Sequence, residues 1–345
     1  MLLKIRKRVD KELNNFLHTL DKDYSVKKIS PLLFEYIREF VLRPGKRIRP
    51  ILFVIAYLGF AKKETSGLYT SALSLELLHD FMLVHDDIID KSDTRRGKPS
   101  MHRMFDIYLS RYKNLKFSGQ DLAIVAGDVM YAIAIHAFLA IKENMARKER
   151  ALKKFIRAAI YTGSGEFIEL LCGTKNIART SKEDIYKIYD FKTANYTFAT
   201  PLASGAILAG AGDKEVERLF RYGIYLGRAF QIRDDILGMF SGEKKIGKSN
   251  LTDLKEAKKT LLVWRAYNQA NAQDKKIIKS TLDKKNADRK DLLRMRKIVT
   301  ATGSLDYCQK EIRRSMNQAQ KLITSSRIGL AYKNALNTSA QEFLL

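Results

Sequence analysis

Residues 77–90 read LLHDFMLVHDDIID, an apolar, helix-like segment that ends in a cluster of aspartates. Residues four apart share one face of a helix, so Asp86 and Asp90 present two carboxylates to the same point while Asp87 points away. A second cluster, DDILG at residues 234–238, lies in another apolar, helix-like segment. The pair of clusters is the strongest indication of function in the chain.

Two carboxylates a few ångströms apart repel each other by roughly 1 to 4 kcal/mol, depending on the effective dielectric constant. A cation between them removes that repulsion. Mg²⁺ suits such a pair, because it takes one or two protein carboxylates, keeps several waters and completes its octahedron with phosphate oxygens. We therefore expect Mg²⁺ and a phosphorylated substrate, with basic residues nearby.

The rest of the chain reads as helix. Apolar residues recur at three- and four-residue spacing, with almost no period-two alternation, and no linker divides the 345 residues. We predict an all-α fold in one domain, residues 1–345. The longest apolar segment, residues 122–141, approaches membrane-spanning length, but it contains Asp128 and His136, which favours a buried core helix.

Composition narrows the class of protein less than the motifs do. There are 63 Lys plus Arg against 38 Asp plus Glu, a net charge of +25. A lysine-rich solvated surface explains this, as do anionic substrates, an anionic membrane surface or nucleic acid. Cys172 and Cys308 form no disulfide framework, and residues 1–10 lack the apolar stretch of a signal peptide, so we expect a cytoplasmic protein.

Groups of cations accompany the aspartates. Residues 44–50, PGKRIRP, suit a turn or helix start, and residues 93–99, DTRRGKP, place two adjacent arginines where they can donate forked hydrogen bonds to phosphate. His79 lies two helical turns before Asp86 on the same face. A basic loop and a satisfied core histidine are the alternative interpretations when each is taken alone.

One motif points elsewhere. Residues 242–249, GEKKIGKS, satisfy the pattern of a phosphate-binding P-loop. A working P-loop joins a buried strand to a helix, whereas the preceding residues 229–240 contain a charged triplet and read as helix. We reject the P-loop interpretation.

Taken in order from Gly45 to Thr260, these motifs resemble the trans-isoprenyl diphosphate synthase (polyprenyl synthetase) family, most closely its short-chain geranylgeranyl and farnesyl diphosphate synthases. The resemblance implies a single large helical bundle of the isoprenoid synthase type with a central active-site cavity. It also implies a homodimer and a Mg²⁺-dependent prenyltransferase that joins isopentenyl diphosphate head to tail to an allylic diphosphate.

The same resemblance implies a role for individual residues. Three Mg²⁺ ions would be held by Asp86, Asp90 and Asp234, with Asp87 and Asp235 behind them. Isopentenyl diphosphate would be bound by Lys46, Arg49, His79 and Arg96. The allylic diphosphate would be bound by Arg95, Lys192, Lys248 and Lys258, and the dipoles of Thr193 and Gln231 would steady the allylic cation.

The chain departs from the family pattern at three places. Gly238 stands where many members have a third aspartate, and the segment 247–253 is one residue longer than usual. Glu166 and Glu169 stand where glutamine and aspartate often occur. These changes are conservative enough for activity to be expected.

Product length in this family is limited by bulky residues before the first motif. Here these are Phe81 and Met82, with Leu78 one turn further. At 1.5 Å per residue, Phe81 and Met82 lie roughly 6 to 7.5 Å along the helix axis from Asp86. The pattern resembles archaeal geranylgeranyl diphosphate synthases, so a twenty-carbon (C20) product is favoured over a fifteen-carbon one. Ordinary core packing is the alternative role for Phe81 and Met82.

Three other functions compete with this interpretation. A terpene cyclase needs no second diphosphate site, so the cations at positions 46, 49 and 96 argue against it. A noncatalytic partner subunit typically loses aspartates, which both motifs here retain. In a nucleic-acid binder the aspartate clusters would repel phosphate unless loaded with metal, so we expect no nucleic acid and, at most, peripheral membrane association.

Overall fold

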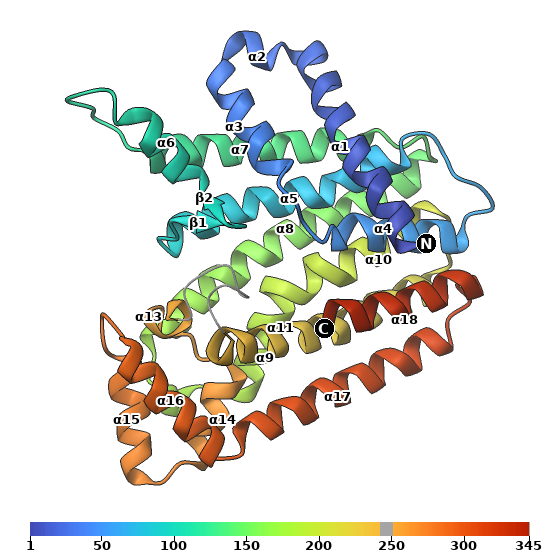
Figure 1. Cartoon of the computed structure of the whole chain (residues 1–345). Helices are drawn as coiled ribbons and strands as arrows, with labels where there is room; N and C mark the ends of the chain where they lie inside the picture. Colours follow the sequence, from blue (N-terminus) through green and yellow to red (C-terminus); the bar gives the residue numbers. More distant parts are fainter. Residues whose placement is uncertain (242–250, 345) are drawn as a thin grey trace. The chain divides into compact units, whose positions relative to one another are not determined.

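Helices form nearly all of the secondary structure in the computed structural model, which describes residues 1–241 and 251–344 (Figure 1). The all-α prediction is confirmed. The helices before residue 175 are α1 (Leu2–Tyr24), α2 (Val26–Ile29), α3 (Pro31–Val41), α4 (Ile48–Phe60), α5 (Leu68–Ile89), α6 (Met101–Leu109), α7 (Gly119–Leu139) and α8 (Met145–Thr174). Two short strands, β1 (Thr94–Arg95) and β2 (Lys98–Pro99), separate α5 from α6.

The second half of the chain continues the helical pattern. Its elements are η1 (Ile177–Arg179), α9 (Lys182–Ile188), η2 (Tyr189–Ala199), α10 (Thr200–Leu208), α11 (Asp213–Phe240), α13 (Thr252–Lys255), α14 (Leu261–Gln269), α15 (Ala272–Leu282), α16 (Arg289–Ala301), α17 (Ser304–Thr324) and α18 (Leu330–Leu344). The element η2 is a π-helix, with hydrogen bonds between residues five apart.

Contacts between Cα atoms divide the chain into two compact units. Unit 1 comprises Met1–Leu152 and Ser204–Ala211, and unit 2 comprises Lys153–Ala203 and Gly212–Leu345. The helices α8 and α10 contribute residues to both units. The single domain over residues 1–345 stays a prediction.

In unit 1, α5 is the central helix and packs against α7, α4 and α1. Its side chains are apolar on most sides and correspondingly buried, as expected for a helix enclosed by neighbours. Gly127 permits the close approach of α7, because a Cβ atom at this position would lie 2.5 Å from Nε2 of His85 on α5. This contact helps to fix the end of α5 that carries the first aspartate motif.

Among the described residues, α7 is the one helix that is long and apolar enough to cross a membrane, by length and composition alone. It packs against α5 and α6 within unit 1. Its buried residues include Ala126, Met130 and Ala134, each with no exposed surface. This packing is the behaviour expected of the core helix that the sequence predicts here.

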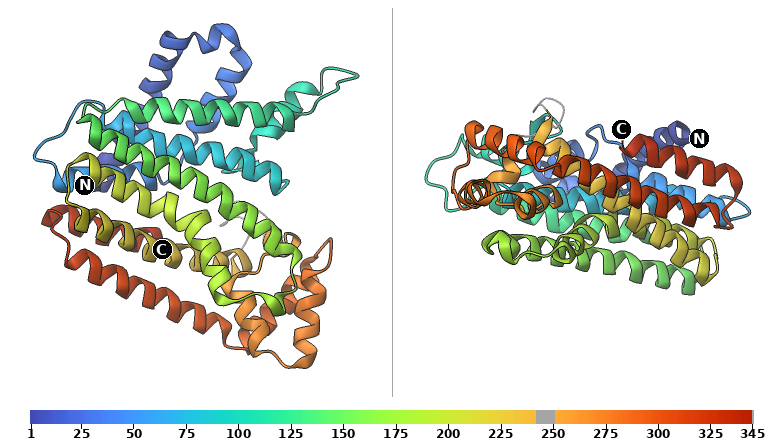
Figure 2. Two further views of the ribbon diagram at one scale, coloured as in Figure 1. Left: turned by 180° about the vertical axis from the view of Figure 1, so that it is seen from behind. Right: turned by 90° about the horizontal axis from the view of Figure 1, so that it is seen from below.

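In unit 2, α11 packs against η2 and α17, and α17 runs beside it in both views of Figure 2. Gly223 and Gly227 bring α11 close to η2. A Cβ atom at Gly227 would lie 2.4 Å from the Cα atom of Ala194, and one at Gly223 would lie 2.4 Å from that of Ala199. Any larger residue would push α11, which carries the second aspartate motif, away from η2.

Candidate active site

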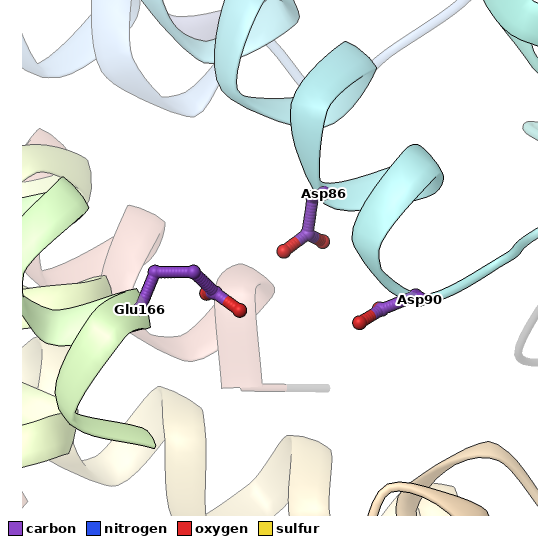
Figure 3. A group of neighbouring side chains, drawn as sticks. All are labelled: Asp86, Asp90 and Glu166. Carbon is purple, nitrogen blue, oxygen red and sulfur yellow. The ribbon is translucent and has the colours of Figure 1, made fainter. Parts of the chain in front are cut away.

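The first aspartate motif occupies the end of α5, in unit 1. Asp86 and Asp90 leave the helix on the same side (Figure 3), and one carboxylate oxygen of each lies within 4.8 Å of the other. Both side chains are partly exposed. The arrangement agrees with the helical spacing and offers hard oxygen donors to a divalent cation. Figure 3 also labels Glu166, which belongs to α8 in unit 2.

Asp87 points into the protein, where it is fully buried and paired with Arg95. Nε of Arg95 donates a hydrogen bond to Oδ1 of Asp87 at 2.9 Å, and Nη2 of Arg95 lies 3.8 Å from Oδ2 of Asp86. Burial raises the pKa of Asp87 to about 6, against the opposing effect of Arg95. Asp87 therefore holds Arg95 beside the carboxylate pair.

The two arginines after the first motif are positioned by a short hairpin. Thr94 pairs with Pro99 and Arg95 with Lys98, and both turn residues, Arg96 and Gly97, have positive φ angles of 54° and 74°. Such a turn is common in two-residue hairpins but rare for arginine. It directs Arg95 toward Asp87 and Arg96 toward Asp80, whose Oδ1 lies 3.2 Å from Nη2 of Arg96.

Arg96 belongs to a buried network of charges in unit 1. Its Nη2 atom lies 3.8 Å from Oε1 of Glu76, and Nη1 of Arg47 donates to the same oxygen at 2.8 Å. Arg47 also pairs with Asp10 at 2.9 Å. Burial raises the pKa of Asp80 to about 7, partly opposed by the charge of Arg96. The network fixes the Arg96 guanidinium from behind.

His79 faces these cations. Its pKa is lowered well below the usual value, first by burial and then by the positive charges of Arg49 and Arg96. The imidazole is therefore neutral at physiological pH. Arg49 is buried at the start of α4, and Lys46 is exposed in the turn before it. Three of the four residues predicted to bind isopentenyl diphosphate thus influence one another electrostatically.

The second aspartate motif lies on α11, in unit 2. Asp234 is partly exposed, whereas Asp235 is buried and accepts hydrogen bonds from Tyr189 and, at 2.9 Å, from Nε2 of Gln231. The hydroxyl of Tyr189 in turn accepts from the backbone N–H of Leu261 at 2.9 Å. The buried aspartate is therefore held by neutral donors.

The hydrogen bonds continue from α11 to η2. Oγ1 of Thr193 donates to Oε1 of Gln231 at 2.6 Å, which links two residues predicted to act on the allylic cation. One residue earlier on η2, Lys192 pairs with Glu166 and Glu169 of α8. A Cβ atom at Gly165 would lie 2.7 Å from the backbone nitrogen of Lys192, so glycine allows α8 to approach η2.

The remaining predicted residues have mixed outcomes. Lys258 lies in unit 2 and pairs with Glu256 at 2.6 Å. Lys248 and the P-loop-like segment 242–249 lie outside the described residues. Phe81 contacts the rings of His85 and Tyr131, with centroid distances of 4.8 and 5.2 Å.

The other two residues of the predicted floor differ in burial. Leu78 has no exposed surface, and Met82 is partly exposed. Phe81 packs against Tyr131 of α7, so it lies at the contact between α5 and α7. A bulky side chain at this contact is supported by α7. The role of all three residues in chain length stays a prediction.

Sequence reasoning missed several residues that hold the predicted ones in place. They are Arg47, Glu76 and Asp80 in unit 1 and Tyr189 in unit 2. Glu76 and Asp80 stand four apart on a strongly apolar helix, and this spacing was a usable signal. No local pattern marks Tyr189, because its partners are distant in sequence.

Comparison with known proteins finds the family that the sequence motifs resemble. The polyprenyl synthetase family matches residues 30–299. The chain is 34% identical to a geranylgeranyl diphosphate synthase of Saccharolobus solfataricus, over 74% of this chain and 72% of that one. It is 31% identical to a geranylfarnesyl diphosphate synthase of Aeropyrum pernix, over 81% of this chain and 83% of the other.

A solved structure is similar over the whole chain. It is a geranylgeranyl pyrophosphate synthase from Corynebacterium glutamicum, complexed with isoprenyl diphosphate and magnesium. It is 27% identical, with a TM-score of 0.91, and the match covers 100% of this chain and 99% of the other.

Proposed function

This chain belongs to the polyprenyl synthetase family and is a prenyltransferase that joins isopentenyl diphosphate to an allylic diphosphate, and we propose that its main product is geranylgeranyl diphosphate. Farnesyl diphosphate is the second candidate. The observation in the chain's own residues that supports the reaction with diphosphate substrates is the set of cations around His79 and Asp86. Arg49, Arg95 and Arg96 all influence these residues, as a site for diphosphate requires.

Isopentenyl diphosphate is bound, in this proposal, by Lys46, Arg49, His79 and Arg96. The arginines offer forked donors to phosphate oxygens, and neutral His79 adds a hydrogen bond without a further charge. Lys46 is exposed, and its flexible side chain allows the ammonium group to move onto the ligand. Glu76 and Asp80 keep Arg96 in position before substrate arrives.

The family uses Mg²⁺, and the oxygen donors of Asp86 and Asp90 fit this ion in type and spacing. We propose that Asp86, Asp90 and Asp234 hold the metal, with three ions present when substrate is bound. Bound Mg²⁺ supplies positive charge that stabilises the departing diphosphate. Asp87 and Asp235 are buried behind their neighbours and orient them.

The protein groups then act on the allylic diphosphate. Arg95, Lys192, Lys248 and Lys258 hold its phosphate oxygens while the carbon–oxygen bond breaks and diphosphate leaves. The double bond of isopentenyl diphosphate attacks the allylic cation, and a proton passes to the departing diphosphate. The oxygen dipoles of Thr193 and Gln231 steady the cation, and the site must exclude water, which would otherwise capture it.

The direct test is incubation of the purified chain with labelled isopentenyl diphosphate, Mg²⁺ and allylic primers of five, ten and fifteen carbons. Products are dephosphorylated and separated by chromatography. Products that end at twenty carbons support the proposal, and products that end at twenty-five or more keep the reaction but reject the proposed length. Absence of any Mg²⁺-dependent product would favour the noncatalytic partner subunit, and cyclic hydrocarbons would indicate a cyclase.

Phe81 tests the proposed floor. Phe81→Ala removes the ring that contacts His85 and Tyr131, which opens space toward α7. We expect products at least one five-carbon unit longer than those of the unchanged enzyme. Tyr36→Ala, which removes an aromatic residue of α3 that packs against the ring of Phe105, is a control that should leave the products unchanged. An unchanged product distribution in Phe81→Ala would reject Phe81 as the floor.

We also propose that the chain forms a homodimer. On α7, Ile124, Val125 and Leu139 are 42%, 56% and 48% exposed, and on α8 Ile160 and Phe167 are 61% and 63% exposed. A group of exposed apolar side chains on each of these two helices favours a protein partner. Sedimentation equilibrium tests the proposal: a monomer at assay concentrations would contradict it, and Val125→Asp should weaken a dimer.

A further inference from the structure

The connection between α6 and α7 exposes apolar and basic side chains together. Ile107, Tyr112, Leu115 and Phe117 are 61%, 50%, 39% and 48% exposed. Arg111, Lys113 and Lys116 are exposed between them. We call these seven residues the 107–117 patch. In Figure 1 the connection extends outward from α6, away from the other helices of unit 1.

The base of this connection is fixed by specific contacts. The backbone N–H of Gly119 donates to Oδ1 of Asp106 at 2.9 Å, and a Cβ atom at Gly119 would lie 2.2 Å from the carbonyl oxygen of His102. Ser118 and Asp121 form a capping box at the start of α7. The two helix ends are thus held together, and the residues between them are presented to solvent.

All of the charged residues in the 107–117 patch are basic. No aspartate or glutamate occurs from residue 107 to residue 120, although acidic residues flank the segment at Asp106 and Asp121. Arg111 lies 4.4 Å from the ring centroid of Tyr108, so one cation is already placed over an aromatic side chain. Aromatic and aliphatic side chains interleaved with Lys and Arg suit the boundary between lipid headgroups and acyl chains.

We propose that the 107–117 patch docks this protein onto an anionic lipid bilayer. Tyr112, Leu115 and Phe117 would enter the headgroup region, and Arg111, Lys113 and Lys116 would contact anionic headgroups. A second copy of the chain fits less well. A symmetric contact with its two-fold axis through the patch would place the three cations of one copy against the same three of the other, with no acid within residues 107–120 to neutralise them.

Vesicle flotation with the full chain tests the proposal, independently of any prenyltransferase activity. We expect binding to vesicles of phosphatidylcholine mixed with phosphatidylglycerol, weaker binding at high salt, and little binding to phosphatidylcholine alone. The triple variant Tyr112→Ser, Leu115→Ser, Phe117→Ser should bind more than about tenfold more weakly. Failure of the unchanged protein to bind anionic vesicles would overturn the proposal.

A matched charge comparison separates the patch from the general excess of positive charge. Arg111→Gln, Lys113→Gln, Lys116→Gln together remove three charges from the patch. Lys310→Gln, Arg313→Gln, Lys321→Gln together remove three exposed charges from α17. The first variant should lose more than about tenfold in vesicle affinity and the second less than about twofold. Equal losses would mean that binding depends on net charge, and the patch would be rejected.

A fluorescent reporter locates the contact. The chain has one tryptophan, Trp264, so Phe117→Trp in a Trp264→Phe background gives a single probe in the patch. Brominated lipids should quench this probe when vesicles are added. Vesicle binding without quenching would place the contact elsewhere and overturn the proposal. Dissociation of an oligomer by the triple serine variant, with vesicle binding unchanged, would instead assign the patch to a second copy.

Discussion

The adjacent aspartates Asp86 and Asp87 on α5 and Asp234 and Asp235 on α11 are held in place by different kinds of contact. In each pair one aspartate is partly exposed and the next is buried. On α5 the buried Asp87 is balanced by the cation Arg95, whereas on α11 the buried Asp235 accepts hydrogen bonds from the neutral groups of Tyr189 and Gln231.

The same Asp-Asp sequence on a helix can therefore be stabilised either by an ion pair or by neutral hydrogen-bond donors. A buried ion pair fixes a cation where an anionic substrate is expected, so Asp87 positions Arg95 as much as itself. Neutral donors fix a carboxylate without placing a cation against it. The two motifs thus differ in what holds the buried aspartate, which is an arginine on α5 and a tyrosine with a glutamine on α11.

The largest expected effect is loss of activity when the exposed member of either pair is removed. Asp86→Ala and Asp234→Ala should each lower kcat/KM by about a thousandfold or more, because each removes a proposed ligand to charge-stabilising metal. Far-UV circular dichroism and thermal melts should show an intact fold. Asp23→Ala, an exposed aspartate of α1, is the control. Full activity in Asp234→Ala would break the equivalence of the two motifs.

The buried members should differ in stability. Asp87→Asn removes the buried charge that Arg95 contacts directly and should lower the free energy of unfolding by about 2 to 4 kcal/mol. Asp235→Asn can still accept from Tyr189 and should lose only about 1 to 2 kcal/mol. Urea denaturation of both variants measures the difference. Equal losses would show that charge balance does not distinguish the two sites.

The share of the site that could be predicted from the sequence differs between the two regions. The spacing of Asp86 and Asp90 follows from helical geometry, and the structure places them on one face as predicted. The contact of Arg96 with Asp80 depends on a turn with positive φ at Arg96, which no periodicity indicates. In unit 2 the π-helix η2 leaves no signal in the apolar pattern, so the partners of Lys192 were not predicted.

A smaller effect concerns pH and the network behind Arg96. The pKa of Asp80 is raised to about 7 in the folded protein, so the folded state binds a proton that the unfolded chain has released between about pH 4 and pH 7. The free energy of unfolding therefore falls as the pH rises through this interval, with a contribution of about 2 to 4 kcal/mol from Asp80.

Asp80→Asn tests this assignment. It should remove most of that contribution to the pH dependence, as measured by urea denaturation of both proteins from acid to neutral pH. The difference between the two proteins isolates Asp80 from other carboxyls, including Asp87. The same slope in both proteins would assign the pH dependence to another group.

The smallest effect is expected at Thr193. Thr193→Val removes the hydroxyl that donates to Gln231, and should lower kcat about tenfold while costing about 1 kcal/mol of stability. Thr193→Ser keeps the donor and should restore most of the rate. If Thr193→Val and Thr193→Ser behave alike, the hydroxyl is not what links η2 to the second motif.

The π-helix η2 also constrains insertions and deletions. A regular α-helix advances about 100° per residue, so deletion of one residue between Lys192 and Ala199 would rotate Lys192 relative to the residues after the deletion by roughly that angle. A point substitution in η2 changes one side chain, whereas a single-residue deletion changes the direction of every side chain on one side of the deletion relative to the other side. Alignments of relatives should therefore treat a gap within residues 189–199 as a change of the active-site residues presented, and not as a neutral loop variation.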